Sequence, residues 1–236
     1  MHASTLLVAL GSLAAAAPAA AHDLFLELAT HRLPARTDAS VALVNGTFGR
    51  SDNVITRDRM LDVSIVGPGR DVAHPPAGDW RDEGTTTWLD FVTGDEGTYV
   101  LGVSTAPRVI ELSAEAFHDY LRHDGVLDVL EQRTRDGLLE QPARERYSKH
   151  VKAALQVGER RTRAFDEVLG YPIEIVPLRN PDELAVGSTL PVRVLLDGAP
   201  LASQLVYASF AGHHVHDDSG GHVEAFSGRT DAEGRV

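Results

Sequence analysis

The sequence contains no cysteine among its 236 residues. Disulfide bridges, thiolate zinc sites, cysteine nucleophiles and a lipid-modified N-terminal cysteine are therefore excluded. Basic residues are also few, with 22 Lys and Arg against 34 Asp and Glu and a formal charge of −12. This charge argues against nucleic acids and anionic membranes as partners, because both attract clustered Lys and Arg, and it is compatible with a small cation.

Catalytic signatures are missing as well. The chain has no Gly-x-Ser-x-Gly elbow, no phosphate-binding glycine loop and no zinc-protease helix motif. With hydrophobic residues at 43%, it has enough apolar material to bury a core. These features favour a folded protein whose function is binding and not catalysis.

The N-terminus carries the one alanine-rich apolar stretch, which is too short for a membrane span, and no later segment reaches that length. Residues 1–21 have the pattern of a cleaved secretory signal peptide, with an apolar core at residues 6–10 and small residues at Ala19, Ala20 and Ala21. The region ahead of the apolar core departs from the usual pattern, since it offers only His2 as a positive charge. We expect cleavage after Ala21, export to the periplasm, and a mature chain that begins at His22.

The mature chain is predicted to be mainly β, with two immunoglobulin-like or transthyretin-like β-sandwich units. Residues 22–112 contain short alternating apolar segments between turns, such as the segment before Gly67-Pro68-Gly69, and form the first unit. Residues 171–236 form the second, in which Leu190, Val192, Val194 and Leu196 alternate strictly. The sequence ends in a turn and a single apolar residue, so we expect this C-terminal unit to be incomplete.

Between the two units, residues 113–170 are predicted to be a helical insertion and linker. Three helices are expected, at residues 113–125, 127–137 and 142–158, with Ser113 as the N-cap of the first. The third is inferred from an apolar stripe at helical spacing, formed by Tyr147, Val151, Ala154 and Leu155.

His22 is the sharpest candidate metal ligand. Cleavage ahead of it would leave an α-amine and an imidazole on one residue, and these two nitrogens can chelate one ion. The α-amine has a pKa near 8, so its deprotonation by a metal at neutral pH costs little. Nitrogen donors favour Cu(II), Ni(II), Co(II) and Zn(II) over Mg(II) and Ca(II).

A second candidate site is the polar stretch 212–222. Its potential metal ligands are His213, His214, His216, Asp217 and His222. In an extended chain His214 and His216 would share a face, and two imidazoles at that spacing can bind one ion. The alternative is a solvated loop with incidental histidines, because the stretch contains three glycines. Whether His22 meets this loop stays open.

Several segments resemble a known bacterial family. They are Ala21–Glu27, Phe117–Leu121, Glu145–Lys149, Asp197–Leu201 and Thr230–Arg235. Together they resemble the NikM-like domain-of-unknown-function family, described as a periplasmic component of nickel or cobalt uptake. The resemblance implies a periplasmic β protein whose partners are a metal ion and a membrane metal transporter.

The leading functional hypothesis is a periplasmic protein that binds Ni, Co or Cu for uptake or delivery. The runner-up is a non-catalytic β-sandwich interaction module of the cell envelope. A third hypothesis is a copper oxidative enzyme that uses His22 in a histidine brace, which also needs a second fixed imidazole.

Overall fold

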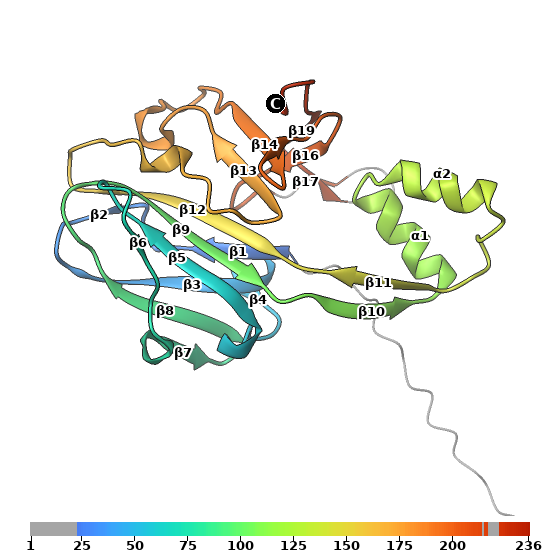
Figure 1. The fold of residues 1–236 in the computed structure, drawn as a ribbon, viewed down its shortest axis with the longest axis horizontal. Coiled ribbons are helices and arrows are strands. Elements are labelled where there is room, and N and C mark those ends of the chain that lie inside the picture. Colours follow the sequence, from blue (N-terminus) through green and yellow to red (C-terminus); the bar gives the residue numbers. More distant parts are fainter. Residues whose placement is uncertain (1–22, 214, 217–221) are drawn as a thin grey trace, which may run out of the picture. The chain divides into compact units, whose positions relative to one another are not determined.

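The structure is a computed structural model, and it describes residues 23–213, 215–216 and 222–236 (Figure 1). The described chain divides into a helical unit, residues 111–143, and a β unit made of residues 23–110 and 144–236. The chain passes between them through two paired strands, β10 (Arg108–Leu112) and β11 (Ala143–Tyr147). The predicted mainly β, sandwich-rich fold is confirmed. Among the described residues, no helix has the length and apolarity that would let it cross a membrane.

Two sheets make up the first part of the β unit. The first has the order β1 (Asp23–Glu27), β3 (Asp38–Thr47), β8 (Thr86–Val92) and β7 (Trp80–Glu83), with β4 (Arg50–Ser51) paired to β3. The second has the order β2 (Arg32–Leu33), β12 (His150–Val157), β9 (Gly97–Thr105), β5 (Met60–Val66) and β6 (Val72–Ala73). Four short 3-10 turns lie between strands, η1 (Arg57–Arg59), η2 (Ala77–Asp79), η3 (Ala164–Asp166) and η4 (Pro181–Glu183).

The core lies between these two sheets. Val41 and Leu43 of β3 and Leu89 of β8 meet Leu101 of β9 and Leu155 of β12, and each of these side chains is at most 3% exposed. Alternate residues of a strand point to opposite faces, so one face of each strand is apolar and buried. The alternation predicted for residues 22–112 is therefore confirmed.

The predicted third helix, at residues 142–158, is wrong. These residues form β11 and β12, and β12 pairs antiparallel with β9 from His150↔Ser104 to Val157↔Gly97. Its core face is Val151, Ala153, Leu155 and Val157, a period of two. The helical stripe was a coincidence of spacing, because Ala154 lies on the opposite face from Leu155. Eight long-range residue pairs outweigh a weak local helical preference.

The first two predicted helices are confirmed as α1 (Ala114–His123) and α2 (Leu127–Arg135). The Ser113 hydroxyl caps α1 by accepting a hydrogen bond from the amide of Ala116 at 3.2 Å. Arg133 of α2 stacks on Phe117 with its guanidinium 5.1 Å from the ring centroid, and its Nε donates to Nε2 of buried His118 at 3.3 Å. One arginine of α2 thus contacts two neighbouring residues of α1.

Residues 171–236 form β structure in three small sheets. Their strands are β13 (Ile173–Pro177), β14 (Val192–Leu196), β15 (Ala199–Pro200), β16 (Leu205–Ala208), β17 (Val215–His216), β18 (His222–Val223) and β19 (Phe226–Arg229). Strand β14 lies between β13 and β15, β16 pairs with β19, and β17 pairs with β18. The last residue extends this pairing, because the backbones of Val192 and Val236 exchange hydrogen bonds of 3.0 and 3.1 Å.

The segment that leads into β13 covers the outer face of the second sheet. At Gly102 of β9, an added Cβ would lie 2.2 Å from Cδ1 of Leu169 and 2.7 Å from the hydroxyl of Tyr171. Glycine is therefore required at this position by close approach of another chain segment, and its backbone φ is not unusual.

We expect Gly102→Ala to destabilise the protein by about 1–3 kcal/mol, because the new methyl group overpacks the covered face. Chemical denaturation measures the change. Gly78→Ala is the matched control, since nothing lies within 4 Å of its added Cβ. Equal stability of the two variants would contradict the close packing of Leu169 and Tyr171 over β9.

Candidate functional site

The histidine-rich stretch forms a hairpin at its described ends. Strands β17 and β18 pair antiparallel with the register Val215↔Val223 and His216↔His222. Residues directly opposite each other in such a pair have Cβ atoms about 4.5–5.5 Å apart and share a face. The structure thus brings together His216 and His222, which are separated by five residues in the sequence. The sequence analysis had predicted no pairing between these two.

His213 also contributes to this hairpin. Its Nε2 lies 2.9 Å from the carbonyl oxygen of Val223, and its ring centroid lies 5.1 Å from that of Phe210. A carbonyl oxygen only accepts hydrogen bonds, so Nε2 of His213 carries the proton. This hydrogen bond connects His213, which precedes β17, to Val223 of β18.

The other predicted ligands, His22, His214 and Asp217, lie outside the described residues. Asp23, which follows His22, begins β1 opposite Gly46 of β3. The negative charge of its carboxylate raises the pKa of Lys149, against the lowering caused by burial. In the part of the chain that the structure describes, no three His, Asp or Glu side chains gather as a metal-binding group.

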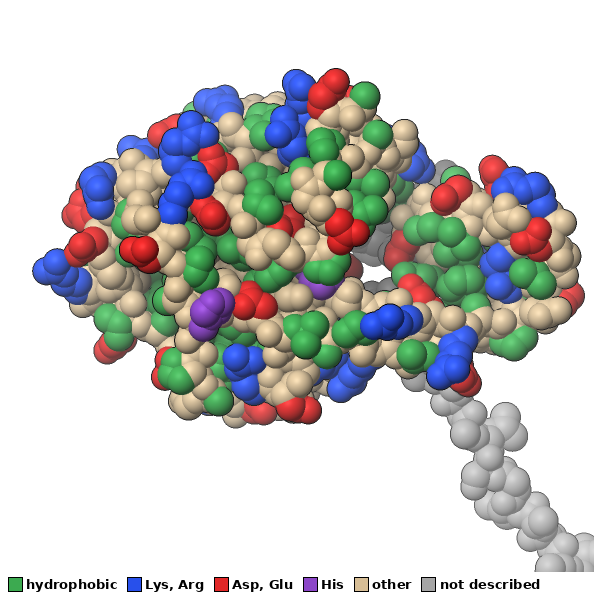
Figure 2. Space-filling model, viewed as in Figure 1, with side chains coloured by type: hydrophobic (Ala, Val, Ile, Leu, Met, Phe, Trp, Pro, Cys, Tyr) green, Lys and Arg blue, Asp and Glu red, His purple; other side chains and the backbone are tan. Residues whose placement is uncertain are grey.

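Acidic and basic side chains are interspersed over the face of the β unit seen in Figure 2. Many arginines of the β unit are paired; Arg70, for example, contacts Asp166 at 2.5 Å and Glu167 at 2.7 Å. The net negative charge therefore coexists with many local ion pairs, which are individually weak at an exposed surface.

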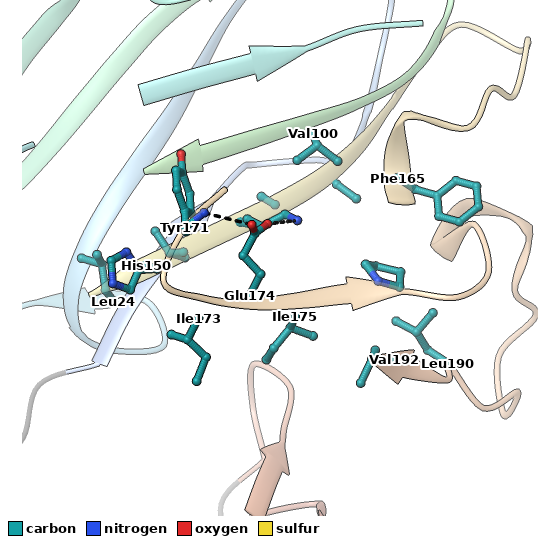
Figure 3. A pocket seen from close by; sticks show the side chains of 15 residues that line it. Leu24, Val100, His150, Phe165, Tyr171, Ile173, Glu174, Ile175, Leu190 and Val192 are labelled. Carbon is teal, nitrogen blue, oxygen red and sulfur yellow. Dashed lines mark hydrogen bonds and ion pairs between the residues drawn. The ribbon is translucent and has the colours of Figure 1, made fainter. Parts of the chain in front are cut away.

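A separate apolar groove of about 340 Å³ lies where β12 faces β13 and β14. Its apolar lining includes Leu24, Phe165, Ile173, Ile175, Leu190 and Val192 (Figure 3). Polar side chains from the outer face of β12 enter the same groove, and the alternation of that strand places them opposite the core. Sequence analysis missed this site because it had assigned β12 to a helix.

The groove contains a buried ion pair between Lys152 of β12 and Glu174 of β13. Its Nζ and Oε2 atoms are 2.9 Å apart, with the side chains 11% and 1% exposed. Glu174 also accepts backbone hydrogen bonds from Leu169, Gly170 and Tyr171 at 3.0, 2.7 and 3.0 Å. Burial by itself would raise the pKa of Glu174, but the hydrogen bond from Lys152 and these amides lower it overall. The carboxylate is thus held in its charged form and fixes the turn before β13.

The remaining polar groups of the groove are also satisfied. His150 lies between two hydroxyls, with Nδ1 2.9 Å from Ser104 Oγ and Nε2 2.9 Å from Ser148 Oγ. Burial lowers the pKa of His150, so the ring is neutral at pH 7. Tyr171 donates to Asp62 Oδ2 at 2.7 Å, and burial raises the pKa of its hydroxyl. These groups hold β13 against the second sheet, and their hydrogen-bonding capacity serves packing.

A family model for a domain of unknown function, DUF4198, matches residues 19–236. The chain is a member of the DUF4198 family. The match spans both β regions and the helical unit of this DUF4198 chain, and its description names no activity, metal or transport system. No curated protein and no solved structure matches the chain.

We expect Glu174→Gln to destabilise this DUF4198 protein by about 3–5 kcal/mol, because it leaves the Lys152 cation buried without a counter-charge. The pKa of Glu174 is lowered in the folded state, so its contribution is full above about pH 4.3 and is lost as the pH falls through the folded value. The difference between wild type and variant in urea denaturation should therefore shrink in acid.

Glu83→Gln is the control, since Glu83 pairs with Arg81 at 2.8 Å while 71% exposed. That change should cost less than about 1 kcal/mol. A Glu174→Gln cost as small as that of the control would show that the buried pair does not hold the turn.

Proposed function

We propose that this protein is a periplasmic transition-metal-binding protein that binds Ni(II), Co(II) or Cu(II) for uptake or delivery. The β17–β18 hairpin is the proposed centre of the metal site. The observation that carries the proposal is the register that places His216 directly opposite His222. A delivery function needs a metal ion and a receiving transporter, and no catalytic residue.

The hairpin supplies a suitable ligand geometry. Directly opposed residues of an antiparallel pair have Cβ atoms about 4.5–5.5 Å apart, so two imidazoles at such positions can bind one metal ion. Imidazole suits Cu(II), Ni(II), Co(II) and Zn(II), while hard cations prefer oxygen. The hydrogen bond from His213 to Val223 stabilises the same pair of strands. His214 and Asp217, outside the described residues, are further proposed ligands.

His22 is the second proposed ligand source, through its imidazole and the α-amine that cleavage after Ala21 would expose. Signal-peptide cleavage and export are part of this proposal, and they rest on the sequence pattern of residues 1–21.

The resemblance to the NikM-like family supports nickel or cobalt as the metal and a membrane transporter as the partner. The competing proposal is an envelope interaction module. Exposed apolar side chains in the C-terminal region favour it, including Ile175 at 49%, Phe210 at 61% and Phe226 at 48% exposed. Single exposed apolar residues are common, however, so these residues do not define a partner.

We expect replacement of both His216 and His222 by alanine to weaken Ni(II), Co(II) and Cu(II) binding by at least about tenfold, or about 1.4 kcal/mol. Equilibrium dialysis of the mature protein measures the change. The matched control is the pair His31→Ala and His74→Ala, because both rings bond backbone carbonyls elsewhere in the β unit. Unchanged affinity in the hairpin variant would remove this site from the proposal.

A second measurement separates the contribution of His22. Adding one residue ahead of His22 converts its α-amine to an amide, which is a poor ligand at neutral pH. We expect the extended protein to lose affinity if the N-terminal chelate binds metal, and to match the native mature protein if the hairpin alone binds it. Dialysis of both forms with Cu(II) and Ni(II) distinguishes these outcomes. A protein that binds none of the three metals at micromolar concentration would favour the interaction module.

A further inference from the structure

Arg59 is a buried arginine without a counter-ion. It ends the 3-10 turn η1, and only 7% of the residue is exposed. No carboxylate of the described chain lies within ion-pair distance of its guanidinium, and its buried Nε has no hydrogen-bond partner. Its one side-chain hydrogen bond is a long one, 3.4 Å from Nη2 to the hydroxyl of Tyr147. A buried, unpaired guanidinium is costly, so its environment calls for an anion.

Other arginines of the β unit contrast with Arg59. Arg32 and Arg161 both contact Asp182, at 2.6 and 2.9 Å, although both are far more exposed than Arg59. The fold therefore supplies carboxylates to arginines that water already solvates. Among the described residues, no carboxylate pairs with Arg59, although Arg59 is more deeply buried than Arg32 and Arg161.

A second cation lies next to Arg59. Lys149, in the connection between β11 and β12, donates from Nζ to Oδ1 of Asn45 at 2.8 Å. Burial and then the charge of Arg59 lower the pKa of Lys149 to about 8, while the carboxylate of Asp23 opposes this shift. The two positive charges are thus close enough to repel each other.

Hydrogen bonds hold the backbone at both residues. The amide of Lys149 donates to the hydroxyl of Thr105 at 2.9 Å, and that hydroxyl donates to the carbonyl of Lys149 at 3.2 Å. The amide of Ala106 donates to the carbonyl of Arg59 at 2.7 Å. The ring of Tyr147 lies 5.8 Å from the guanidinium carbon. These contacts lower the entropic cost of binding a ligand at the two cations.

We propose that Arg59 and Lys149 form a binding site for a small oxyanion, a carboxylate or a phosphate, with Tyr147 and Asn45 as neutral neighbours. The planar guanidinium suits bidentate recognition of such groups, and the ammonium adds a point charge. The site shares no residue with the β17–β18 hairpin, the proposed centre of the metal site. Anions would thus bind at this site although the net charge of the protein is negative.

The test measures how strongly anions protect the amine of Lys149. Wild-type protein is acylated at pH 8 in rising phosphate, acetate or sulfate, with sodium chloride at matched ionic strength as the reference, and each lysine is quantified by peptide mass spectrometry. A bound anion stabilises the protonated amine, so labelling of Lys149 should fall saturably by at least threefold with one or more of the oxyanions. Labelling of Lys152 should not respond.

Arg59→Gln should abolish this protection, while Arg36→Gln should preserve it, since Arg36 is exposed and paired with Asp95 at 2.7 Å. If Arg59→Gln does not fold, Arg59→Lys replaces it and should raise the oxyanion concentration that gives half-maximal protection at least tenfold, through loss of the bidentate contact. Phosphate and acetate arms show which oxyanion the site prefers. Three results would each overturn the proposal: equal protection of Lys149 by chloride, protection that persists in Arg59→Gln, or no protection by any of the three oxyanions. Metal binding measured in the Arg59 variant keeps this outcome distinct from that of the metal proposal.

Discussion

The antiparallel pairing of β12 with β9 organises the β unit. It joins residues that are 46 to 60 positions apart, from His150↔Ser104 to Val157↔Gly97, and places β12 inside the second sheet. Because side chains alternate along a strand, this one register gives β12 two different faces. Val151, Ala153 and Leu155 enter the sandwich core, while His150 and Lys152 face the groove. A shift by one residue would bury the charge of Lys152 in the core and expose the apolar residues.

The groove shows how the C-terminal strands are attached to this sheet. Lys152 and Glu174 join β12 to β13 by a buried ion pair, and Glu174 also accepts the amides of the turn before β13. A buried ion pair contributes little net stability compared with apolar packing, but breaking it is costly. The pair therefore specifies the position of β13 more than it strengthens the fold. Gly102 permits the same approach, since any side chain there would collide with Leu169 and Tyr171.

The two proposed binding sites have opposite charge preferences. The β17–β18 hairpin offers paired histidines in an acidic protein, which suits a transition-metal cation. Arg59, which is buried, and Lys149, which is partly buried, concentrate positive charge, which suits an oxyanion. Such a separation is possible because burial strengthens local electrostatics, whereas the net charge acts mainly at longer range through screened solvent. Membership of the DUF4198 family leaves both functions to experiment.

Local patterns in the sequence were enough to predict the mainly β class, the sandwich alternation before residue 112, and the helices α1 and α2 with the cap at Ser113. They also identified the histidines of the hairpin as candidate ligands. Each of these features depends on residues close together in the chain. The tertiary structure alone decided that β11 and β12 are strands, that His216 pairs with His222, and that Arg59 lies near Lys149 with no carboxylate of the described residues paired to it. These features depend on pairing between distant segments, and the apolar spacing at 147–155 fits a helix as well as a strand until β9 is present as a partner.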